Sequence, residues 1–245
     1  GSFRRDTRHS KRAEERLEEA GGIGGNVLEL NGFYNMDCME GMKQFPDKYF
    51  ELAIVDPPYR DNNQPTKDMR NNGSMKSLEG RPTEKYWEEL YRVSKNQIIW
   101  GANNFTLPQF KGFVVWDKGI PEKFTMSMAE IASLSEGLAT ISKIFKYRAA
   151  GQGNRIHPTQ KPVALYEWLL NNYAKKGDKI LDTHVGSASS LIACHKLGFQ
   201  YVGFELDEDY FKSATARLEA VKSQISIFDE PEPTEQWEQV SLYDT

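Results

Sequence analysis

Short apolar runs alternate with helix-like stretches along this sequence, and this alternation constrains the fold more than any other feature. A strand, helix and strand at this spacing are typical of a parallel sheet with helices packed against it. We therefore expect an α/β fold. The expected strands are 27–30, 33–36, 52–55, 97–100, 113–116, 139–145, 180–182 and 201–204, and the expected helices are 84–93, 163–172, 189–197 and 208–223.

The two ends of the chain differ in charge from its middle. The 245 residues carry 31 Lys and Arg against 35 Asp and Glu, for a formal net charge of −4. Acids gather in 229–245 and basic residues near the start. We interpret 1–25 as a flexible charged arm, 26–228 as the folded domain and 229–245 as an acidic tail. Within the domain, 61–80 is rich in Asn, Gly, Lys and Ser, and we expect a mobile loop there.

Composition argues against several protein classes. No apolar run approaches the roughly 18 residues that a membrane span needs, and the Arg-rich start lacks the apolar segment of a secretory signal. Cys38 and Cys194 are the only cysteines and have no CxxC spacing, so we expect neither a disulfide framework nor a zinc finger. Neither His9 nor His195 has a cluster of possible ligands nearby in the sequence, so we expect no metal site. These features favour a cytoplasmic protein.

Asp56-Pro57-Pro58-Tyr59 directly follows the apolar run 53–55. Consecutive prolines fix two φ angles and remove two backbone donors, which leaves the neighbouring carbonyls rigid and unpaired. A carboxylate and a free carbonyl can accept both hydrogens of one exocyclic NH₂ group, and a tyrosine offers a face for a planar base. Open α/β sheets bind ligands at the carboxyl ends of their strands, where this segment falls. We predict a base-amine site here, with a proline-stiffened turn as the alternative.

Two further segments indicate a cofactor. The expected strand ending at Asp182 runs into a turn of small residues and then a helix, whose free N–H groups can face a ligand. About 20 residues later Glu205 ends the next strand, where a carboxylate can hold ribose hydroxyls. Ordinary strand–helix packing is the alternative. His157–Pro162, which reads HPTQKP, precedes the expected helix at Val163, and Thr159 is placed to cap it.

In sequence and in order, these three segments resemble the β-class amino-DNA methyltransferases of the DPPY type, which use S-adenosylmethionine. The resemblance spans roughly residues 30–215. The tetrad comes first, HPTQKP second and the cofactor loop last, which is the circularly permuted order of that family. The resemblance implies a Rossmann-like methyltransferase fold, circularly permuted, with a mixed, mostly parallel sheet and helices on both faces.

The resemblance also implies roles for individual residues. The catalytic residues are Asp56, Pro57, Pro58 and Tyr59. The residues that bind S-adenosylmethionine are Asp37, Cys38, Thr159, Lys161, Asp182, His184, Gly186, Ser187 and Glu205. In this assignment Asp37 reads the adenine amine of the cofactor and Glu205 holds its ribose. Thr159 and Lys161 help to hold its amino-acid end.

The sequence departs from the family pattern in two places. Thr183, His184 and Ala188 stand where the family usually has Pro, Phe and Gly, and Ala188 restricts the backbone more than Gly would. The sheet-like region 117–150 also leaves little room for the family's sizeable target-recognition insert, so we expect it to form a small one. Sequence specificity is then short, degenerate, or supplied by 61–80 or a partner.

The predicted function is site-specific methylation of DNA at the exocyclic N6 of adenine. Asp at position 56 resembles the adenine-N6 enzymes, because the cytosine-N4 enzymes usually have Ser there. A duplex base must be flipped out to reach such a site, and Tyr59 would stack on it. The alternatives are a cytosine-N4 or RNA methyltransferase with the same pocket, and a non-catalytic subunit that binds DNA or a partner.

The partners expected from this interpretation are double-stranded DNA and either a second copy of the chain or a partner subunit, with no membrane. We expect a cytoplasmic, nucleoid-associated protein of a bacterial or phage-like restriction–modification system.

Overall fold

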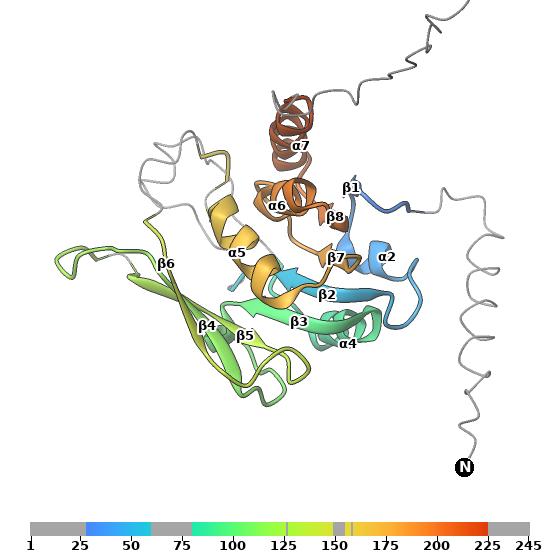
Figure 1. The fold of residues 1–245 in the computed structure, drawn as a ribbon. Helices are drawn as coiled ribbons and strands as arrows, with labels where there is room; N and C mark the ends of the chain where they lie inside the picture. The colour runs from blue at the N-terminus through green and yellow to red at the C-terminus, as the bar shows by residue number, and fades with distance from the viewer. Residues whose placement is uncertain (1–27, 60–79, 126, 149–154, 158, 225–245) are drawn as a thin grey trace, which may run out of the picture.

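The computed structural model (Figure 1) describes residues 28–59, 80–125, 127–148, 155–157 and 159–224. The expected arm at 1–25, the tail at 229–245 and all of the loop at 61–80 except Gly80 lie outside these residues, as does Pro158. The structural expectations for those segments stay predictions, and so do the domain boundaries.

One eight-stranded sheet organises the described part of the chain, in the order β1-β8-β7-β2-β3-β5-β4-β6. The strands are β1 (Gly32–Asn35), β2 (Phe50–Val55), β3 (Ser94–Trp100), β4 (Gly112–Asp117), β5 (Ala129–Leu134), β6 (Lys143–Lys146), β7 (Lys179–Asp182) and β8 (Gln200–Glu205). Neighbours from β1 to β3 in this order are parallel, as are β4 and β6, whereas β5 is antiparallel to both β3 and β4. The predicted mixed, mostly parallel sheet is confirmed.

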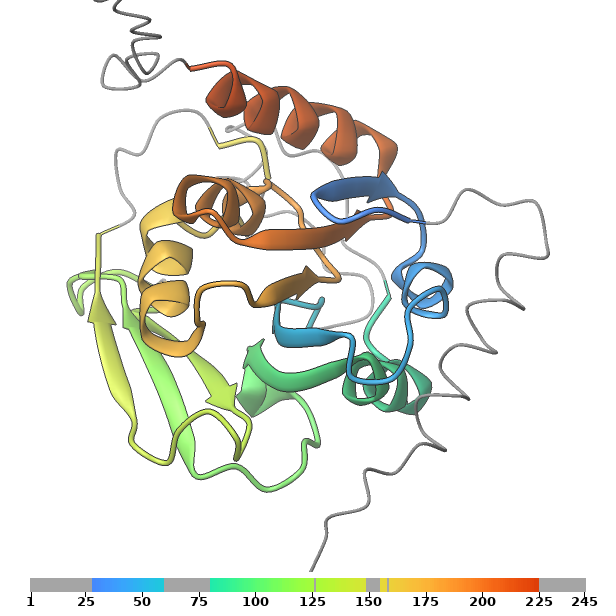
Figure 2. The same cartoon turned by 45° about the vertical axis from the view of Figure 1, so that its right-hand side comes forward.

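Helices cover both faces of this sheet (Figures 1 and 2). They are α2 (Cys38–Met42), α4 (Glu84–Val93), α5 (Val163–Tyr173), α6 (Ser189–Leu197) and α7 (Glu208–Lys222), with the short 3-10 helix η1 (Ala102–Asn104). One face packs against α5, α6 and α7, and the other against α2 and α4. No helix in the described ranges combines the length and apolar character needed to cross a membrane.

Strand β2 shows why its sequence is apolar at consecutive positions. Leu52 and Ile54 belong to the cluster that includes α5 and α6, whereas Ala53 and Val55 belong to the cluster that includes α4. All four side chains are at most 1% exposed. A strand buried on both faces needs apolar residues on both, which is the pattern of a central parallel strand.

Some expectations about the local structure are wrong. Residues 28–30 form no strand, and Asn31 turns the chain there with a φ of 62°. The strand expected at 139–145 is limited to β6, whereas β5 and α2 were not expected. The sequence of β5 places Glu130 and Ser133 among its apolar residues, so local propensity is weak. Its hydrogen bonds to β3 and β4 stabilise the strand conformation that these residues favour only weakly on their own.

Thr159 does not cap α5. Pro162 occupies the N-cap position, and no side chain bonds there. Thr159 instead turns back to His157, whose Nδ1 lies 3.2 Å from its hydroxyl oxygen. The proline still fits the helix entry, because its fixed φ suits the extended conformation observed at that position.

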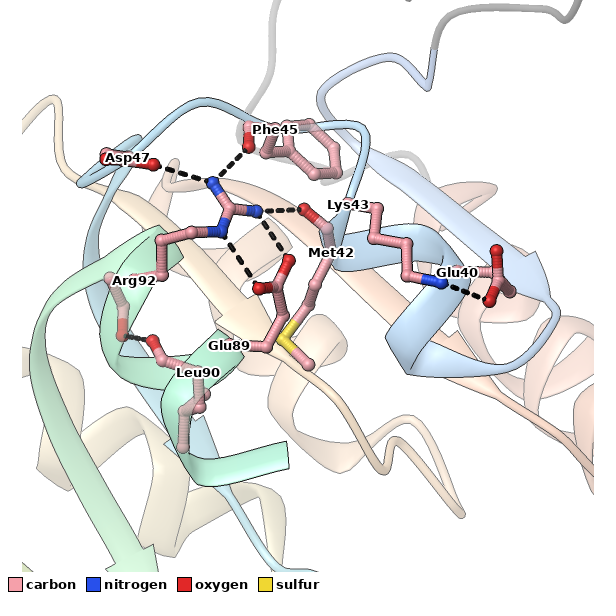
Figure 3. Close-up of polar contacts among 9 residues, drawn as sticks. Glu40, Met42, Lys43, Phe45, Asp47, Glu89, Leu90 and Arg92 are labelled. Carbon is pink, nitrogen blue, oxygen red and sulfur yellow. Dashed lines mark hydrogen bonds and ion pairs between the residues drawn. The ribbon is translucent and has the colours of Figure 1, made fainter. Parts of the chain in front are cut away.

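Arg92, near the end of α4, fastens that helix to the segment between α2 and β2 (Figure 3). Its guanidinium pairs with Glu89 and Asp47 at 2.6 Å and 2.9 Å. It also donates to the backbone carbonyls of Met42 and Phe45. The chain therefore enters β2 from a fixed position, and β2 leads directly to the Asp56 tetrad.

Candidate active site

The carboxyl ends of the parallel strands bring four of the expected acids to one edge of the sheet. Asp37 follows β1, Glu205 ends β8, Asp182 ends β7 and Asp56 follows β2. The connection from β7 to β8 crosses one face through α6, whereas the connection from β2 to β3 crosses the other face through α4. The connections that leave β7 and β2, two neighbouring strands, thus run over opposite faces of the sheet. Open α/β sheets bind ligands at such a topological switch point.

Both oxygens of the Asp56 carboxylate are engaged. Its Oδ1 accepts a hydrogen bond of 2.7 Å from the Tyr59 hydroxyl, and its Oδ2 pairs with the Lys161 ammonium. Lys161 is 3% exposed and also lies 3.0 Å from Glu130. Burial alone lowers the pKa of Lys161, but Asp56 and Glu130 outweigh it and raise this pKa well above its ordinary value. Lys161 is therefore a permanent cation beside Asp56.

Tyr59 has room for its ring because residue 101 is glycine. A Cβ on Gly101 would lie 2.1 Å from the Cε1 atom of Tyr59, and the φ of 68° at this position also favours glycine. Phe105 meets the ring edge-on, with centroids 6.0 Å apart. Burial and the Asp56 charge raise the pKa of the Tyr59 phenol. The phenol therefore stays protonated and keeps donating to Asp56.

The turn after β7 is held by two carboxylates. Asp182 accepts from the backbone N–H of His184 and from the hydroxyl of Ser190. Glu205 accepts from the backbone N–H of Gly186 at 2.9 Å, and its other oxygen accepts from the N–H of Asp207. These bonds join the carboxyl ends of β7 and β8 and define the predicted cofactor loop.

Thr183 and His184, which depart from the family pattern, form a hydrogen-bonded unit. The Thr183 hydroxyl oxygen lies 2.9 Å from Nδ1 of His184 and 2.7 Å from the hydroxyl of Tyr86 on α4. Burial lowers the pKa of His184 to about 4, so the ring is neutral at pH 7. A neutral, oriented ring thus takes the place of the family's phenylalanine.

The next residues of the loop lead into α6. Ser187 is buried, and its carbonyl accepts a 2.6 Å hydrogen bond from Arg217 on α7. Ala188, the N-cap of α6, has a φ of 61°, in the region that favours glycine. The loop therefore keeps the left-handed conformation that a glycine there would adopt freely.

The remaining expected cofactor residues lie near this edge in different roles. Asp37 caps α2 by accepting from the N–H of Met39 at 2.8 Å. Cys38 is partly buried, and burial raises the pKa of its thiol to about 12. His157, from the HPTQKP segment, packs against Gly186, where a Cβ would lie 3.3 Å from its ring. That segment therefore touches both the cofactor loop and, through Lys161, the tetrad.

Several residues of the site were not found from the sequence. Glu130 lies in the unexpected strand β5, opposite Trp116 of β4. Lys118 follows β4 and pairs with Glu130. An antiparallel pairing of 112–117 with 129–134 is the signal that would have found both. Among the described residues, no three His, Cys, Asp or Glu side chains gather as a metal site would require.

A protein family described as "DNA methylase", named N6_N4_Mtase, matches residues 59–216, which is more than half of the chain. The chain belongs to this DNA methylase family. Among curated relatives, YubD of Escherichia coli (strain K12) is 26% identical over 220 residues, covering 79% of this chain and 92% of YubD. The type II methyltransferase M.HpaI of Haemophilus parainfluenzae is 24% identical over 240 residues, covering 79% of this chain and 76% of M.HpaI.

Solved structures show the same fold for this DNA methylase. The M1.HpyAVI–SAM complex superposes with a TM-score of 0.51 at 19% identity, covering 76% of this chain and 98% of that one. The PvuII DNA methyltransferase, titled cytosine-N4-specific, superposes with a TM-score of 0.51 at 12% identity, covering 80% of this chain and 91% of that one. At these identities the likeness establishes the Rossmann-like methyltransferase fold and nothing finer.

Proposed function

We propose that this DNA methylase transfers a methyl group from S-adenosylmethionine to the exocyclic N6 of adenine in double-stranded DNA, after flipping the base out of the helix. The observation that carries the proposal is the Asp56 carboxylate, which stands at the carboxyl end of β2 between the Tyr59 hydroxyl and the Lys161 ammonium. The order of tetrad, HPTQKP and cofactor loop supports assignment to the circularly permuted β class.

The amine of adenine is a poor nucleophile because its lone pair is delocalised into the ring. In the proposed mechanism, Asp56 and the Pro57 carbonyl accept its two N–H bonds and draw the nitrogen toward pyramidal geometry. Each oxygen of Asp56 has a further lone pair beyond those used by Tyr59 and Lys161. The face of Tyr59 stacks on the base. Positioning and hydrogen bonding are thus the contribution of the protein.

The buried acids fit the cationic and hydroxyl groups of S-adenosylmethionine, which supplies an electrophilic methyl group on a sulfonium. Asp182 is 2% exposed, its two hydrogen-bond donors are neutral, and within the described ranges no Lys or Arg pairs with it. Burial raises its pKa to about 7, so a cation is the partner that this carboxylate lacks. Glu205 keeps free lone pairs for ribose hydroxyls.

The other proposed cofactor contacts follow from placement. Asp37 stands at the end of β1, beside Glu205 in the sheet register through Asn35, and would take the adenine amine of the cofactor. The segments that follow β1 and β7 contain four more of the assigned cofactor residues: Cys38, His184, Gly186 and Ser187. Thr159 would reach the amino-acid end of the cofactor.

We assign Lys161 to Asp56 rather than to the cofactor, since Asp56 and Glu130 already hold its ammonium.

Cytosine-N4 methylation is the second candidate, because the matching family includes both N6 and N4 in its name and the PvuII enzyme shares the fold. The Asp at position 56 supports adenine. A DNA substrate also supports the expected nucleoid association, and the second copy or partner subunit remains a prediction.

The deciding experiment incubates the full chain with methyl-labelled S-adenosylmethionine and methylation-free DNA, then digests the DNA and identifies the nucleosides. We expect labelled N6-methyladenine. Labelled N4-methylcytosine would keep the site and overturn the base assignment. Absence of product from duplex DNA, single-stranded DNA and RNA would favour a non-catalytic subunit over this proposal.

The role of Asp56 is tested with Asp56→Ala and Asp56→Asn, which keeps the side-chain volume beside Lys161. We expect turnover to fall by at least about 100-fold, while calorimetry shows the affinity for S-adenosylhomocysteine, which lacks the sulfonium charge, within a few-fold of the wild type. Asp178→Asn is the matched control, because Asp178 precedes β7 at the opposite edge of the sheet, and among the described residues its side chain bonds only the N–H of Lys175. Full activity in both Asp56 variants would contradict the mechanism.

A further inference from the structure

A chain of alternating charges extends from Asp56 into the sheet. Lys161 pairs with Asp56 and lies 3.0 Å from one oxygen of Glu130, whose other oxygen pairs with Lys118. The side chains of Lys161, Asp56, Lys118 and Glu130 are 3%, 12%, 19% and 23% exposed. The four residues come from four separate parts of the chain, so only the folded sheet assembles them.

One tryptophan ring lies beside each of the two ammonium groups. Lys161 lies 5.4 Å from the centroid of Trp100, and Lys118 lies 5.2 Å from that of Trp116. Trp116 is the register partner of Glu130, and Trp100 pairs with Ala132 on the same strand, β5. Water is thus largely kept from these charges, and each charge acts over a longer range than at the surface.

Charge balance in this row depends on Glu130. Lys161 and Lys118 together lower the pKa of Glu130 to about 2 against the opposing effect of burial, so Glu130 is ionised at pH 7. Two cations and two anions then sum to zero. Removing the charge of Glu130 leaves a net positive charge next to Asp56 and leaves Asp56 as the one carboxylate, among the described residues, that contacts Lys161.

We propose that Glu130 is a positioning residue for methyl transfer: by sharing the Lys161 ammonium with Asp56, it keeps Asp56 available to the target amine and keeps the site electrically neutral. This inference rests on the proposed function. In the proposed function the target amine contacts both Asp56 and the methyl group, so the sulfonium would lie close to this row of charges. As the N–CH₃ bond forms and the S–CH₃ bond breaks, the nitrogen would gain positive charge until it releases one of its protons, and an uncompensated Lys161 would oppose that gain.

Cofactor binding offers a test that does not depend on turnover. S-adenosylmethionine carries the sulfonium charge, whereas the product S-adenosylhomocysteine has a neutral thioether in its place. In Glu130→Gln, the unbalanced positive charge weakens binding of the sulfonium form more than that of the thioether form. We expect the ratio of the two affinities, measured by calorimetry, to shift about 3- to 10-fold against S-adenosylmethionine. A defect in folding or packing would instead weaken the binding of both ligands by the same factor and leave the ratio unchanged.

Turnover gives the second readout. We expect Glu130→Gln to lower kcat about 10- to 100-fold with little change in KM for DNA, and Glu130→Asp to restore much of the loss because it keeps the charge. Glu136→Gln is the matched control, because Glu136 follows the same strand, and its one side-chain contact within the described part of the chain is an exposed ion pair, 3.4 Å from Lys111.

The outcomes separate this inference from the proposed function. If the wild type binds both ligands and methylates DNA but Glu130→Gln keeps the affinity ratio and kcat, only the role of Glu130 is overturned. A lower melting temperature with unchanged kcat assigns Glu130 to packing and also overturns the role. If the wild type binds neither ligand, the proposed function fails and the inference fails with it.

Discussion

At the residue scale, Asp182 has the clearest link between burial and chemistry. Its carboxylate is buried at the end of β7, and neutral donors satisfy it only in part. Desolvation is the main reason that its pKa rises to about 7. A buried carboxylate that binds a proton can exchange that proton for a cationic ligand, so cofactor binding and proton release are linked.

This shift predicts a pH dependence of stability. In the folded protein Asp182 has a pKa of about 7, against an ordinary value of 3.8. The folded state therefore binds a proton at Asp182 more tightly than the unfolded state does. The resulting gain in the free energy of unfolding is complete below pH 3.8 and is lost as pH rises through 7. We expect the free energy of unfolding to fall over this window by up to about 1.4 kcal/mol per pH unit, more steeply in the wild type than in Asp182→Asn. Urea denaturation of the ligand-free protein at stepped pH measures both slopes. Equal slopes would contradict the assignment.

At the scale of elements, Arg92 shows how a helix outside the site fixes a strand within it. The Arg92 side chain is 22% exposed, and its guanidinium binds two acids and two backbone carbonyls, which ties the end of α4 to the segment leading into β2. A planar group with several donors suits this cluster better than the single ammonium of lysine would. These contacts thus hold the end of α4 against the segment that enters β2, at the opposite end of the strand from Asp56.

We expect Arg92→Met to lower the melting temperature by roughly 4–8 °C, because losing these bonds costs about 2 kcal/mol of the free energy of unfolding. The contacts of Arg92 lie apart from Asp56 and Asp182, so methyl transfer per folded molecule should stay near the wild-type value. Lys43→Met is the control: Figure 3 shows Lys43 paired with Glu40, but both side chains are more than half exposed. Thermal unfolding should barely change in that variant. Equal shifts in the two variants would refute the role of Arg92.

At the scale of the whole molecule, the sheet builds one site from both halves of the chain. Asp37 and Asp56 come from the first quarter of the sequence, whereas Asp182 and Glu205 come from the last third. Strand β7 pairs with β2 on one side and β8 on the other, and so joins the two groups. A ligand that spans this edge therefore bridges segments distant in sequence.

A cofactor bound across this edge should stabilise the whole fold. At a concentration about 100 times its Kd, S-adenosylmethionine adds about 2.7 kcal/mol to the free energy of unfolding, which corresponds to a rise in melting temperature of roughly 5–10 °C. Differential scanning calorimetry with and without the cofactor measures the shift. Adenosine monophosphate at the same concentration is the control, because it lacks the sulfonium and the amino-acid end. An unchanged melting temperature at saturating cofactor would argue against a cofactor site at this edge.

Local sequence predicted those elements whose pattern is strong. The helix at Glu84–Val93 was predicted with its observed bounds, because its apolar residues recur at helical spacing and face the sheet. The mostly parallel sheet was likewise predictable from apolar runs separated by helices. Strand β5 was not, since a run interrupted by Glu130 and Ser133 reads as a strand only beside β3 and β4.

The sequence by itself determined which kind of protein this is. Three motifs in a fixed order indicate a DNA methyltransferase: the tetrad Asp56–Tyr59, the segment His157–Pro162 and the acid Glu205. The match to the DNA methylase family confirms this prediction. Such motifs can be recognised in a sequence because their properties depend on adjacent residues. A proline pair, a tight turn or an acid at the end of a strand is determined by residues that are neighbours along the chain.

Only the tertiary structure decided which charges meet. Lys161 pairs with Asp56 across 105 positions of sequence, and Glu130 joins them from a strand that was not expected. An ion pair of this kind depends on distance and burial, and both are set by how strands and loops pack rather than by neighbours along the chain. The sequence therefore names the reaction class, whereas the fold assembles the electrostatic environment in which the reaction would take place.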